Sequence, residues 1–516
     1  MTVDDILAQP FGTLPGLIRE HAARQPRRPA LVQDERTLDY AEFDALVDRI
    51  AAALQRDGMQ PGDAIAICAA TSLEYAAVFL GGLRAGIAVA PLAPSSTAAS
   101  VATMTADAGA KLFFLDDALA QALEPVRERI AARFIGLDGS KNSFAAWLAP
   151  AGAKPAPVGI QPDWPFNIIY SSGTTGTPKG IVQPHAMRWA QVQRASAYGY
   201  GPDTVTLVAT PLYSNTTLVS FIPTLALGGS VVLMAKFDAA AYLALAEKHR
   251  ATHAMLVPVQ YQRIMALPDF GRYDLSSFRF KFSTSAPFSA ALKADILKRW
   301  PGGLIEYYGM TEGGGTCILA AHEHPHKLHT VGCAAPGHDI RLIDDAGREL
   351  LPGETGEVVG HSPGMMTGYH NQPEKTAEAE WHDPAGKRFI RTGDIGRFDT
   401  DGFLVLIDRK KDMIISGGFN LYPSDLEAVL RERDDVADVA VVGVPSERWG
   451  ETPVAFVVPK TGATPDVAEL LAWTNSRVGK MQRLSAVELI DMLPRSAIGK
   501  VLKRELREGY GGKGGC

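Results

Sequence analysis

The sequence predicts an α/β protein with a large N-terminal domain, in which helices cover parallel and mixed sheets beside a β-subdomain, and a small α+β C-terminal domain. The chain has 516 residues, more than one hydrophobic core usually holds. Between about residues 160 and 310, short apolar runs alternate with longer helical patterns, which is typical of parallel sheets covered by helices. From about Ile340, Gly and Asp separate shorter β-like runs.

The alternation begins beside a loop rich in Gly, Ser and Thr. The run Phe166 to Tyr170 predicts a buried strand, the loop YSSGTTGTPKG continues to Gly180, and a helix is expected after the loop, over 185–197. The further strands are expected at 204–209, 230–234, 253–257, 278–282 and 304–308, and the further helices at 218–227, 239–250 and 289–300. Gly228 and Gly229 are typical of a helix C-terminus.

The C-terminal part follows a different pattern. The runs IRLID, GEVVG, FIRTGD and GFLVLIDR predict short strands. Beyond Arg409 we expect strands at 413–416, 436–442 and 454–458 and helices at 425–433, 466–478 and 501–508, with Ser424 as the N-cap of the first helix. We therefore place a domain boundary near residues 408–411.

Composition excludes several classes of protein. The chain is 46% hydrophobic and 21% charged, carries a formal net charge of −6 and has no Lys/Arg block, so no nucleic-acid partner is expected. The N-terminus is acidic without a sustained apolar region, which argues against a signal peptide. The longest apolar run, near residues 221–235, is too short for an integral membrane segment. Four scattered cysteines without CxxC spacing favour a cytoplasmic protein. Whether the chain forms a homodimer stays open.

The Gly-rich loop has the residues of a phosphate-binding loop without a Walker pattern. Pro178 precedes Lys179, and Gly180 follows it where a Walker loop has Ser or Thr, while GxGxxG is absent. The glycines still let backbone N–H groups converge, the hydroxyls can donate, and Lys179 adds a cation. On the loop alone, phosphate binding and a flexible surface turn are equally supported.

Three later segments favour the phosphate-binding interpretation. YYGMTEGG, from Tyr307 to Gly314, places an aromatic ring near a carboxylate after a predicted strand. In FIRTGD, Asp394 follows a Gly turn, and its two oxygens can accept both hydroxyls of a ribose. In LPRSAIGKVLKREL, a Gly-Lys pair begins a basic terminal helix.

In this order, these segments resemble motifs of the adenylate-forming superfamily of acyl-CoA synthetases, luciferases and peptide-synthetase adenylation domains. YSSGTTGTPKG is similar to its phosphate loop, and YGMTE, RTGD, DRKKDMIISGGFNLYPSDLE and PRSAIGK to its later motifs. The resemblance spans nearly the whole chain and is closest to carboxylic acid–CoA ligases of the fatty acid or aryl acid type. It implies ATP, Mg²⁺ and coenzyme A as cosubstrates, a domain 1–408, a hinge at 409–411 and a mobile lid domain 412–516.

The resemblance implies an ATP site from several segments. Thr311 and Glu312 would contact the α-phosphate and Mg²⁺, with Glu312 as a metal ligand; Tyr308 would stack on adenine, and Asp394 and Arg409 would hold the ribose. The implied ATP- and AMP-binding residues are Ser171, Ser172, Gly173, Thr174, Thr175, Gly176, Thr177, Lys179, Ser285, Ala286, Pro287, Tyr307, Tyr308, Gly309, Met310, Thr311, Asp394, Arg409 and Lys500. Without the resemblance, Lys179 would be interpreted as a solvated loop residue, Tyr308 as a core aromatic residue and Asp394 as a turn residue.

Lys500 is implied as a catalytic residue, together with Thr311 and Glu312. Its charge would stabilise the phosphorus transition state that forms when a carboxylate displaces pyrophosphate. A lysine there would block the later attack of a thiol, so the resemblance implies a swing of the small domain about Lys411. Without the resemblance, both lysines would be interpreted as ordinary exposed charges.

Further residues are implied for coenzyme A and the acyl group. Ser416, Gly417 and Gly418 would line the pantetheine channel and Trp449 would lie near the nucleotide, although Trp449 has core packing as its alternative. Tyr213, Ser214, Thr217, Val257, Gln260, Tyr307 and Thr316 are candidates for the acyl pocket, and core packing explains each equally well. Ser214 stands where many relatives have His, and neither it nor Asn215 offers a charge for an α-amine. We therefore expect an apolar fatty or aromatic monocarboxylate.

Three alternatives remain. One is an acyl-AMP ligase that loads a carrier protein; Gly417 and Gly418 favour coenzyme A. A second is a nucleotide-binding regulator without catalysis, which Glu312, Asp394 and Lys500 argue against. A third, a P-loop phosphotransferase, is disfavoured by Pro178 and Gly180.

Overall fold

The computed structural model describes residues 2–138, 143–171, 178–416, 419–446, 448–496 and 499–511. The chain forms two compact units: unit 1 contains residues 1–340 and 360–390, and unit 2 contains residues 341–359 and 391–516. Helices and parallel or mixed sheets alternate, which confirms the predicted α/β fold class. The predicted boundary at 408–411 falls inside unit 2, and a hinge there stays a prediction.

The first sheet of unit 1 has the strand order β15-β14-β13-β12-β11-β9-β10-β1-β2. Its strands are β1 Pro29–Gln33, β2 Arg36–Asp39, β9 Val205–Val208, β10 Ser230–Leu233, β11 His253–Leu256, β12 Phe280–Ser283, β13 Gly303–Gly309, β14 Thr316–Ala320 and β15 Cys333–Ala334. The strands from β1 to β13 in this order are parallel, and β2, β14 and β15 pair antiparallel at the edges. This sheet contains the strands that were predicted between residues 204 and 308.

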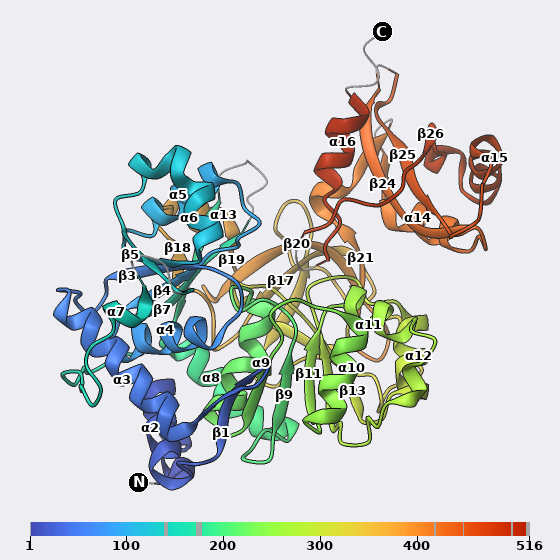
Figure 1. Ribbon diagram of the computed structural model, residues 1–516. Helices are drawn as coiled ribbons and strands as arrows, with labels where there is room; N and C mark the ends of the chain where they lie inside the picture. Colours follow the sequence, from blue (N-terminus) through green and yellow to red (C-terminus); the bar gives the residue numbers. More distant parts are fainter. Residues whose placement is uncertain are drawn as a thin grey trace. The chain divides into compact units, whose positions relative to one another are not determined.

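The helices that connect these strands lie alongside the sheet, as Figure 1 shows for α9 to α12. They are α8 His185–Ala195, α9 Asn215–Ala226, α10 Ala239–Lys248, α11 Pro258–Met265 and α12 Ala290–Arg299, with short 3-10 turns η2 Ser196–Tyr198 and η3 Phe270–Arg272. Helix α12 begins where Ser289 caps its first turn by accepting a hydrogen bond from the Leu292 N–H. The predicted helices therefore agree with the structure to within a few residues at each end.

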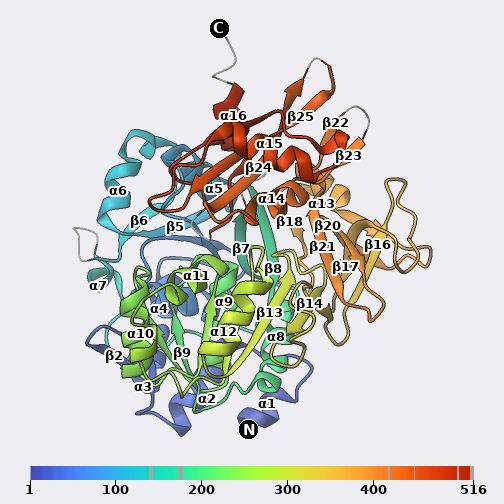
Figure 2. The ribbon, with the colours of Figure 1, turned by 90° about the vertical axis from the view of Figure 1, so that its right-hand side faces the viewer.

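The second sheet of unit 1 has the order β18-β8-β7-β4-β3-β5-β6. Its strands are β3 Ala64–Cys68, β4 Ala88–Pro91, β5 Ala110–Leu115, β6 Arg133–Gly136, β7 Pro165–Ser171, β8 Lys179–Pro184 and β18 Gly368–Tyr369. Figure 2 shows β7 beside β8, with which it pairs antiparallel. The helix predicted at 185–197 is present as α8, but the apolar run of β8, which was not predicted as a strand, completes a hairpin before it.

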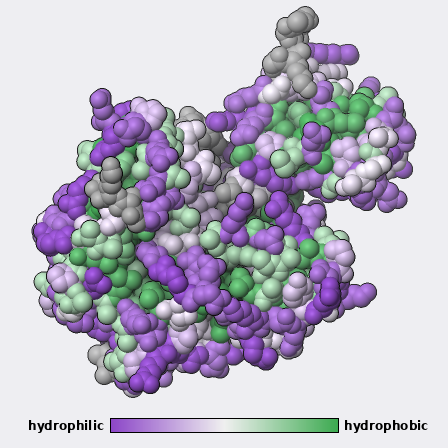
Figure 3. Space-filling model, viewed as in Figure 1, coloured by the Kyte–Doolittle hydropathy of each residue, from purple (hydrophilic) through white to green (hydrophobic). Residues whose placement is uncertain are grey.

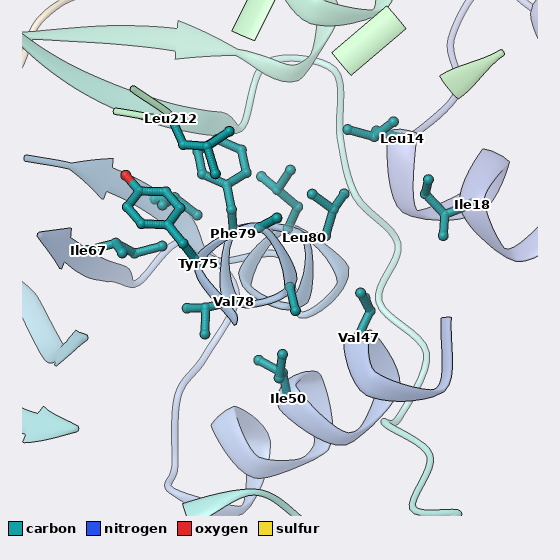
Figure 4. Close-up of a cluster of buried hydrophobic side chains, with 14 of the residues drawn as sticks. Leu14, Ile18, Val47, Ile50, Ile67, Tyr75, Val78, Phe79, Leu80 and Leu212 are labelled. Atoms are coloured by element: carbon teal, nitrogen blue, oxygen red, sulfur yellow. The ribbon is translucent and has the colours of Figure 1, made fainter. Parts of the chain in front are cut away.

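The largest hydrophobic core joins the helices of the N-terminal segment to both sheets. The helices of this segment in the core are α1 Val3–Leu7, α2 Leu14–Arg24, α3 Tyr40–Arg56, α4 Leu73–Arg84 and α7 Phe144–Trp147, whereas α5 Ala98–Asp107, α6 Asp117–Leu123 and the 3-10 turn η1 Glu124–Arg129 pack in a separate core. Figure 4 shows Phe79 and Leu80 of α4 among side chains of α2 and α3. A Cβ atom at Gly81 of α4 would lie 2.3 Å from the Ile50 side chain, so the close approach of α4 to α3 requires glycine there.

A third sheet has the order β16-β17-β20-β19, with β21 paired to β20. Its strands are β16 Asp339–Ile343, β17 Gly356–His361, β19 Glu380–His382, β20 Arg388–Phe398 and β21 Leu404–Arg409, and α13 spans Pro373–Ala379. The division of the chain falls within β16, β17 and β20. These strands contain the four β-like runs of the sequence, so the predicted β-subdomain is present.

Unit 2 also contains the sheet β23-β22-β25-β24, with β26 paired to β25. Its elements are β22 Ile414–Ser416, β23 Phe419–Leu421, α14 Pro423–Arg431, β24 Val436–Ser446, β25 Gly450–Pro459, α15 Val467–Arg477, β26 Ala486–Leu489 and α16 Lys503–Gly511, with 3-10 turns η4 Lys410–Asp412 and η5 Lys480–Gln482. The C-terminal helix begins at Lys503, so Lys500 precedes it and does not begin it.

The predicted N-cap of α14 was wrong. Helix α14 starts at Pro423, whose fixed φ suits a first helical turn, and Tyr422 precedes it. Ser424 instead donates its hydroxyl to the Ile407 carbonyl (2.6 Å) and its N–H to Asp408 Oδ2 (2.9 Å). This serine therefore joins α14 to the end of β21.

Among the described residues, no helix has both the length and the apolar composition to cross a bilayer. Figure 3 shows hydrophilic residues over much of the visible face of each unit, with smaller hydrophobic areas between them. This agrees with helices that bury one face against a sheet and expose the other.

Candidate functional site

The predicted site residues of unit 1 lie in segments that follow neighbouring parallel strands. Ser214 follows β9, Val257 follows β11, Ser285 follows β12 and Thr311 follows β13. Parallel strands have their carboxyl ends at the same edge of a sheet, and ligands of open α/β sheets bind outside that edge. The fold therefore brings these four segments together at a place suited to a ligand.

The Gly-rich loop connects β7 to β8. Ser171 ends β7, Lys179 begins β8, and the two residues are partners in the antiparallel register. The predicted residues between them, from Ser172 to Thr177, lie outside the described residues. The Lys179 Nζ atom lies 4.9 Å from the centroid of the Tyr369 ring. The hairpin therefore fixes the backbone position of Lys179 at the end of the Gly-rich loop.

Thr311 and Glu312 lie in the turn after β13, where hydrogen bonds from two other segments hold them. The Thr311 carbonyl accepts from Gln183 Nε2 of β8 at 2.7 Å. The Glu312 carbonyl accepts from the Met366 N–H at 2.8 Å, and its carboxylate Oε1 accepts from the Tyr369 hydroxyl at 2.9 Å. The turn is thereby held next to the end of the Gly-rich loop.

The carboxylate of Glu312 suits a Mg²⁺ ion whose other ligands come from water and from the phosphates of a nucleotide. Within the described ranges, no three His, Cys, Asp or Glu side chains gather as a metal site. Mg²⁺ at phosphate sites usually binds one or two carboxylates, water and the phosphates themselves. Glu312 is half-buried and offers such a carboxylate.

The predicted adenine-contacting segment has one residue in an uncommon backbone conformation. Ser285 has φ +79°, in the left-handed region, which costs a residue other than glycine about 1 kcal/mol or more. Its hydroxyl lies 2.6 Å from the hydroxyl of Thr216, in the first turn of α9. Ser285 and Pro287 are exposed and Ala286 is half-buried. The segment is therefore anchored to α9 while its surface stays accessible.

An aromatic cluster adjoins the predicted acyl pocket. The rings of Tyr307 and Phe282 are stacked with centroids 5.6 Å apart, and Tyr198 meets Tyr307 edge-on at 6.0 Å. Burial, followed by the charges of nearby tyrosines, raises the pKa of the Tyr307 hydroxyl. The two faces of this cluster are provided by strands β12 and β13 and by the turn after α8.

Other candidates for the acyl lining make contacts that stabilise the segments around them. Ser214 caps α9, and the Thr217 hydroxyl donates to the Pro211 carbonyl at 2.6 Å. Gln260 donates to the Ala209 carbonyl at 3.0 Å and accepts from the Val257 N–H at 3.1 Å. Tyr213 is half-buried, and Thr316 pairs with Gly309 across β13 and β14. Their contact with an acyl group stays a prediction.

A buried polar network, which the sequence did not predict, holds the Thr311 turn. Arg188 of α8 is 3% exposed and donates to Gln183 Oε1 and to Asn215 Oδ1, the latter at 2.8 Å. Burial lowers the pKa of this guanidinium to about 9. Gln183 in turn donates to Thr311, so the network links α8, β8 and α9 to that turn. The sequence signal for this network was the presence of the polar residues Asn167 and Gln183 within strands that are otherwise apolar.

Unit 2 brings together the other charged residues of the prediction. Asp394 and Arg409 are register partners on β20 and β21, and Arg409 Nε lies 2.6 Å from Asp394 Oδ1. Burial lowers the pKa of Lys500 to about 8, and the charges of Arg409 and Lys411 add to this effect, while Asp394 opposes it. The predicted ribose, hinge and catalytic residues of this unit are therefore close enough to affect each other's charge.

Two of the residues predicted for coenzyme A, Ser416 and Trp449, lie where the neighbouring strands β22 and β25 meet. Ser416 ends β22, is 5% exposed and pairs with Gly450, which follows Trp449 directly. Trp449 is 40% exposed, and the Arg448 guanidinium lies 4.7 Å from its ring centroid. Gly417 and Gly418 lie outside the described residues. Trp449 is thus not the core residue of the alternative interpretation.

Comparisons with known proteins agree with this arrangement. The AMP-binding enzyme family matches residues 18–370, and the AMP-binding enzyme C-terminal domain matches residues 425–500. An indoleacetate–CoA ligase of Aromatoleum aromaticum is 34% identical over 95% of this chain and 97% of its own. A fatty acid–[acyl-carrier-protein] ligase, ScoC of Streptomyces coeruleorubidus, is 33% identical over 95% of each chain.

A solved structure of ATP-bound MatB from Rhodopseudomonas palustris superposes with a TM-score of 0.87 and 30% identity, covering 97% of this chain and 99% of that one. The matched family covers most of the sequence, and the similarity to full-length relatives spans both units. The chain therefore belongs to the AMP-binding enzyme family.

Proposed function

We propose that the protein is an ATP-dependent carboxylic acid–CoA ligase. In the first half-reaction, a carboxylate oxygen bonds to the α-phosphorus of ATP, the bond from that phosphorus to the β-phosphate bridge breaks, and pyrophosphate leaves. In the second, the thiolate of coenzyme A bonds to the acyl carbon, the bond from that carbon to the AMP oxygen breaks, and AMP leaves. The observation that carries this proposal is the similarity to an indoleacetate–CoA ligase over 95% of the chain.

The charged residues of unit 2 have roles that follow from their chemistry. The carboxylate of Asp394 accepts the ribose hydroxyls, and the ion pair with Arg409 orients that carboxylate. Lys500 stabilises the negative charge that accumulates at the α-phosphate during adenylation. Its lowered pKa leaves it largely protonated at neutral pH, because about 8 is still above 7.

The phosphate-side roles belong to unit 1. Lys179 and the Gly-rich loop bind the β- and γ-phosphates, Thr311 binds the α-phosphate, and Glu312 binds the magnesium of Mg·ATP. When bound, Mg²⁺ neutralises phosphate charge. The hydrogen bonds to the Thr311 and Glu312 carbonyls hold both residues in position before the nucleotide binds.

The acid substrate in this proposal is an apolar fatty or aromatic monocarboxylate. The aromatic cluster of Tyr198, Phe282 and Tyr307 supports an apolar acyl group. Ser214 and Asn215 at the start of α9 offer no carboxylate for an α-amine, which disfavours amino acids. Coenzyme A is the proposed acceptor, and a carrier protein is the second candidate, because one relative of similar identity loads such a protein.

Pyrophosphate release tests the reaction class. Purified protein is given Mg·ATP and a panel of short, medium, long, branched and aromatic acids, each with and without coenzyme A. We expect AMP and pyrophosphate with at least one apolar acid, and acyl-CoA only when coenzyme A is present. Release of ADP and phosphate without an acyl adenylate contradicts the proposal.

The acceptor is tested on the adenylate itself. A single turnover without acceptor is followed by addition of coenzyme A or of a carrier protein bearing phosphopantetheine. Faster consumption of the acyl adenylate by free coenzyme A supports the proposed acceptor, and faster loading of the carrier protein overturns it.

A further inference from the structure

Tyr369 lies between two groups of the predicted ATP site that come from different segments. Its hydroxyl donates to Glu312 Oε1 at 2.9 Å, while its ring lies 4.9 Å from the Lys179 ammonium. We propose that Tyr369 is a positioning residue that orients the Glu312 carboxylate for magnesium and the Lys179 ammonium for the phosphates of ATP. This inference rests on the proposed function.

The backbone of Tyr369 is fixed by its own neighbours. On β18, Tyr369 pairs with Ile181 of β8, two residues beyond Lys179. Its N–H donates to the Thr376 hydroxyl at 2.9 Å, and the N–H of the next residue, His370, donates to the Gly180 carbonyl at 2.7 Å. Tyr369 is 9% exposed. The Tyr369 side chain therefore extends from a fixed backbone position beside the end of the Gly-rich loop.

At the carboxylate end, the phenol donates to one oxygen of Glu312 and restricts the orientation of the carboxylate. A carboxylate that accepts a hydrogen bond at Oε1 keeps its second oxygen free to bind a cation, and a fixed orientation lowers the entropy lost on binding. The backbone of Glu312 is already held by the Met366 N–H. The same short segment, residues 366–369, therefore fixes both the main chain and the side chain of this residue.

At the lysine end, the ring acts through its negatively charged face. An ammonium within about 6 Å of a tyrosine ring centroid is attracted to that face. The contact directs the flexible side chain of Lys179 toward the side of the hairpin where Glu312 lies. Tyr369 can thus hold a cation and a carboxylate in one place with two chemically distinct parts of its side chain.

Two variants separate these parts. Tyr369→Phe removes the hydroxyl and keeps the ring, whereas Tyr369→Leu removes both. ATP binding is measured by calorimetry without acid substrate, so that no turnover occurs, over a range of Mg²⁺ concentrations and also with EDTA. For Tyr369→Phe we expect the Mg²⁺ concentration at half-maximal binding to rise about tenfold with unchanged affinity in EDTA. For Tyr369→Leu we expect the same rise and about threefold weaker binding in EDTA.

Tyr40→Phe is the control, because it removes a buried hydrogen bond of another phenol in unit 1, from Tyr40 to the Gly229 carbonyl (2.7 Å), and Tyr40 is not a predicted site residue. It should keep the magnesium dependence of the unmodified protein. An unchanged magnesium dependence in Tyr369→Phe overturns the inference, as does a loss of equal size in the Tyr40→Phe control. Pyrophosphate release by the unmodified protein reports separately on the proposed function, so failure of one proposal is distinguishable from failure of the other.

Discussion

Lys500 shows how one residue acquires its chemistry from its surroundings. Burial in unit 2 lowers its pKa to about 8, and the cationic Arg409 and Lys411 act in the same direction. Asp394 and Asp412 act in the opposite direction, and without them the lysine would lose its proton still more readily. A lysine whose pKa is about 8 is mostly charged at pH 7. Small changes in its environment can alter that charge.

Replacement of Lys500 should separate the two half-reactions. For Lys500→Ala we expect adenylation to fall about 100-fold or more, because the cation proposed to stabilise the reacting phosphate is lost. Thioester formation from supplied acyl adenylate should stay near the unmodified rate, as measured by single-turnover assays of each step. The exposed Lys460→Ala is the control. Equal losses in both steps would contradict the assigned role.

The pH dependence of adenylation should report the charge of Lys500. The ammonium is present below its pKa and lost above it, so the adenylation rate should fall as the pH rises through about 8. Lys500→Arg should remove this fall, since guanidinium keeps its proton. Arg409→Gln should move the midpoint to higher pH, because a repelling charge is removed. A midpoint that stays at the same pH in Arg409→Gln would argue against this electrostatic coupling.

At the scale of elements, short connections determine where the charged groups lie. The 3-10 turn η4 joins β21, which ends at Arg409, to β22, which ends at Ser416. Thus the predicted ribose contact, hinge and coenzyme A channel follow one another within a few residues. A backbone hydrogen bond of this turn runs from the Met413 N–H to the Arg409 carbonyl, so the amide of Lys411 is not its donor.

A proline at Lys411 should impair the proposed swing without loss of that hydrogen bond. For Lys411→Pro we expect adenylation within about threefold of normal and thioester formation slowed about 100-fold, because proline fixes φ and restricts the preceding residue. Separate assays of the two steps measure this. Lys411→Ala, which keeps the backbone free, should preserve both rates. Normal overall turnover of the proline variant would reject a hinge at this position.

At the scale of the whole molecule, buried histidines couple stability to acid. Burial lowers the pKa of His185 and of His253 to about 4, and both belong to unit 1. Because the unfolded chain binds their protons near pH 6.5, the folded state is favoured above that pH and loses this advantage as the pH falls toward 4.

We therefore expect the free energy of unfolding to drop by about 1 kcal/mol for each of these histidines between pH 6.5 and 5.5. Urea denaturation at several pH values measures it. His185 stacks edge-on against Phe166, so His185→Phe should remain packed and show a smaller drop. Replacement of the exposed His382 by Gln is the control. A drop of the same size in His185→Phe would show that His185 does not contribute.

Much of the fold and the family could be predicted from the sequence, because the signals were local. Apolar runs of strand length, helix-ending glycines such as Gly228, and motifs with contiguous polar residues depend on neighbours within a few positions. The strand β8 was missed because the Gly-rich loop before it concealed the apolar run, and the N-cap of α14 was misplaced because Pro423 was overlooked.

The sequence by itself determined the α/β class, the membership of a family that activates carboxylates, and the identities of charged residues such as Asp394 and Lys500. Only the tertiary structure decided which of these residues meet. Tyr369 is 57 positions from Glu312, and Arg188 contacts Asn215 across 27 positions. Such contacts arise from strand pairing and helix packing, which join distant parts of the chain. A local pattern of residues does not contain the information about which distant segments meet.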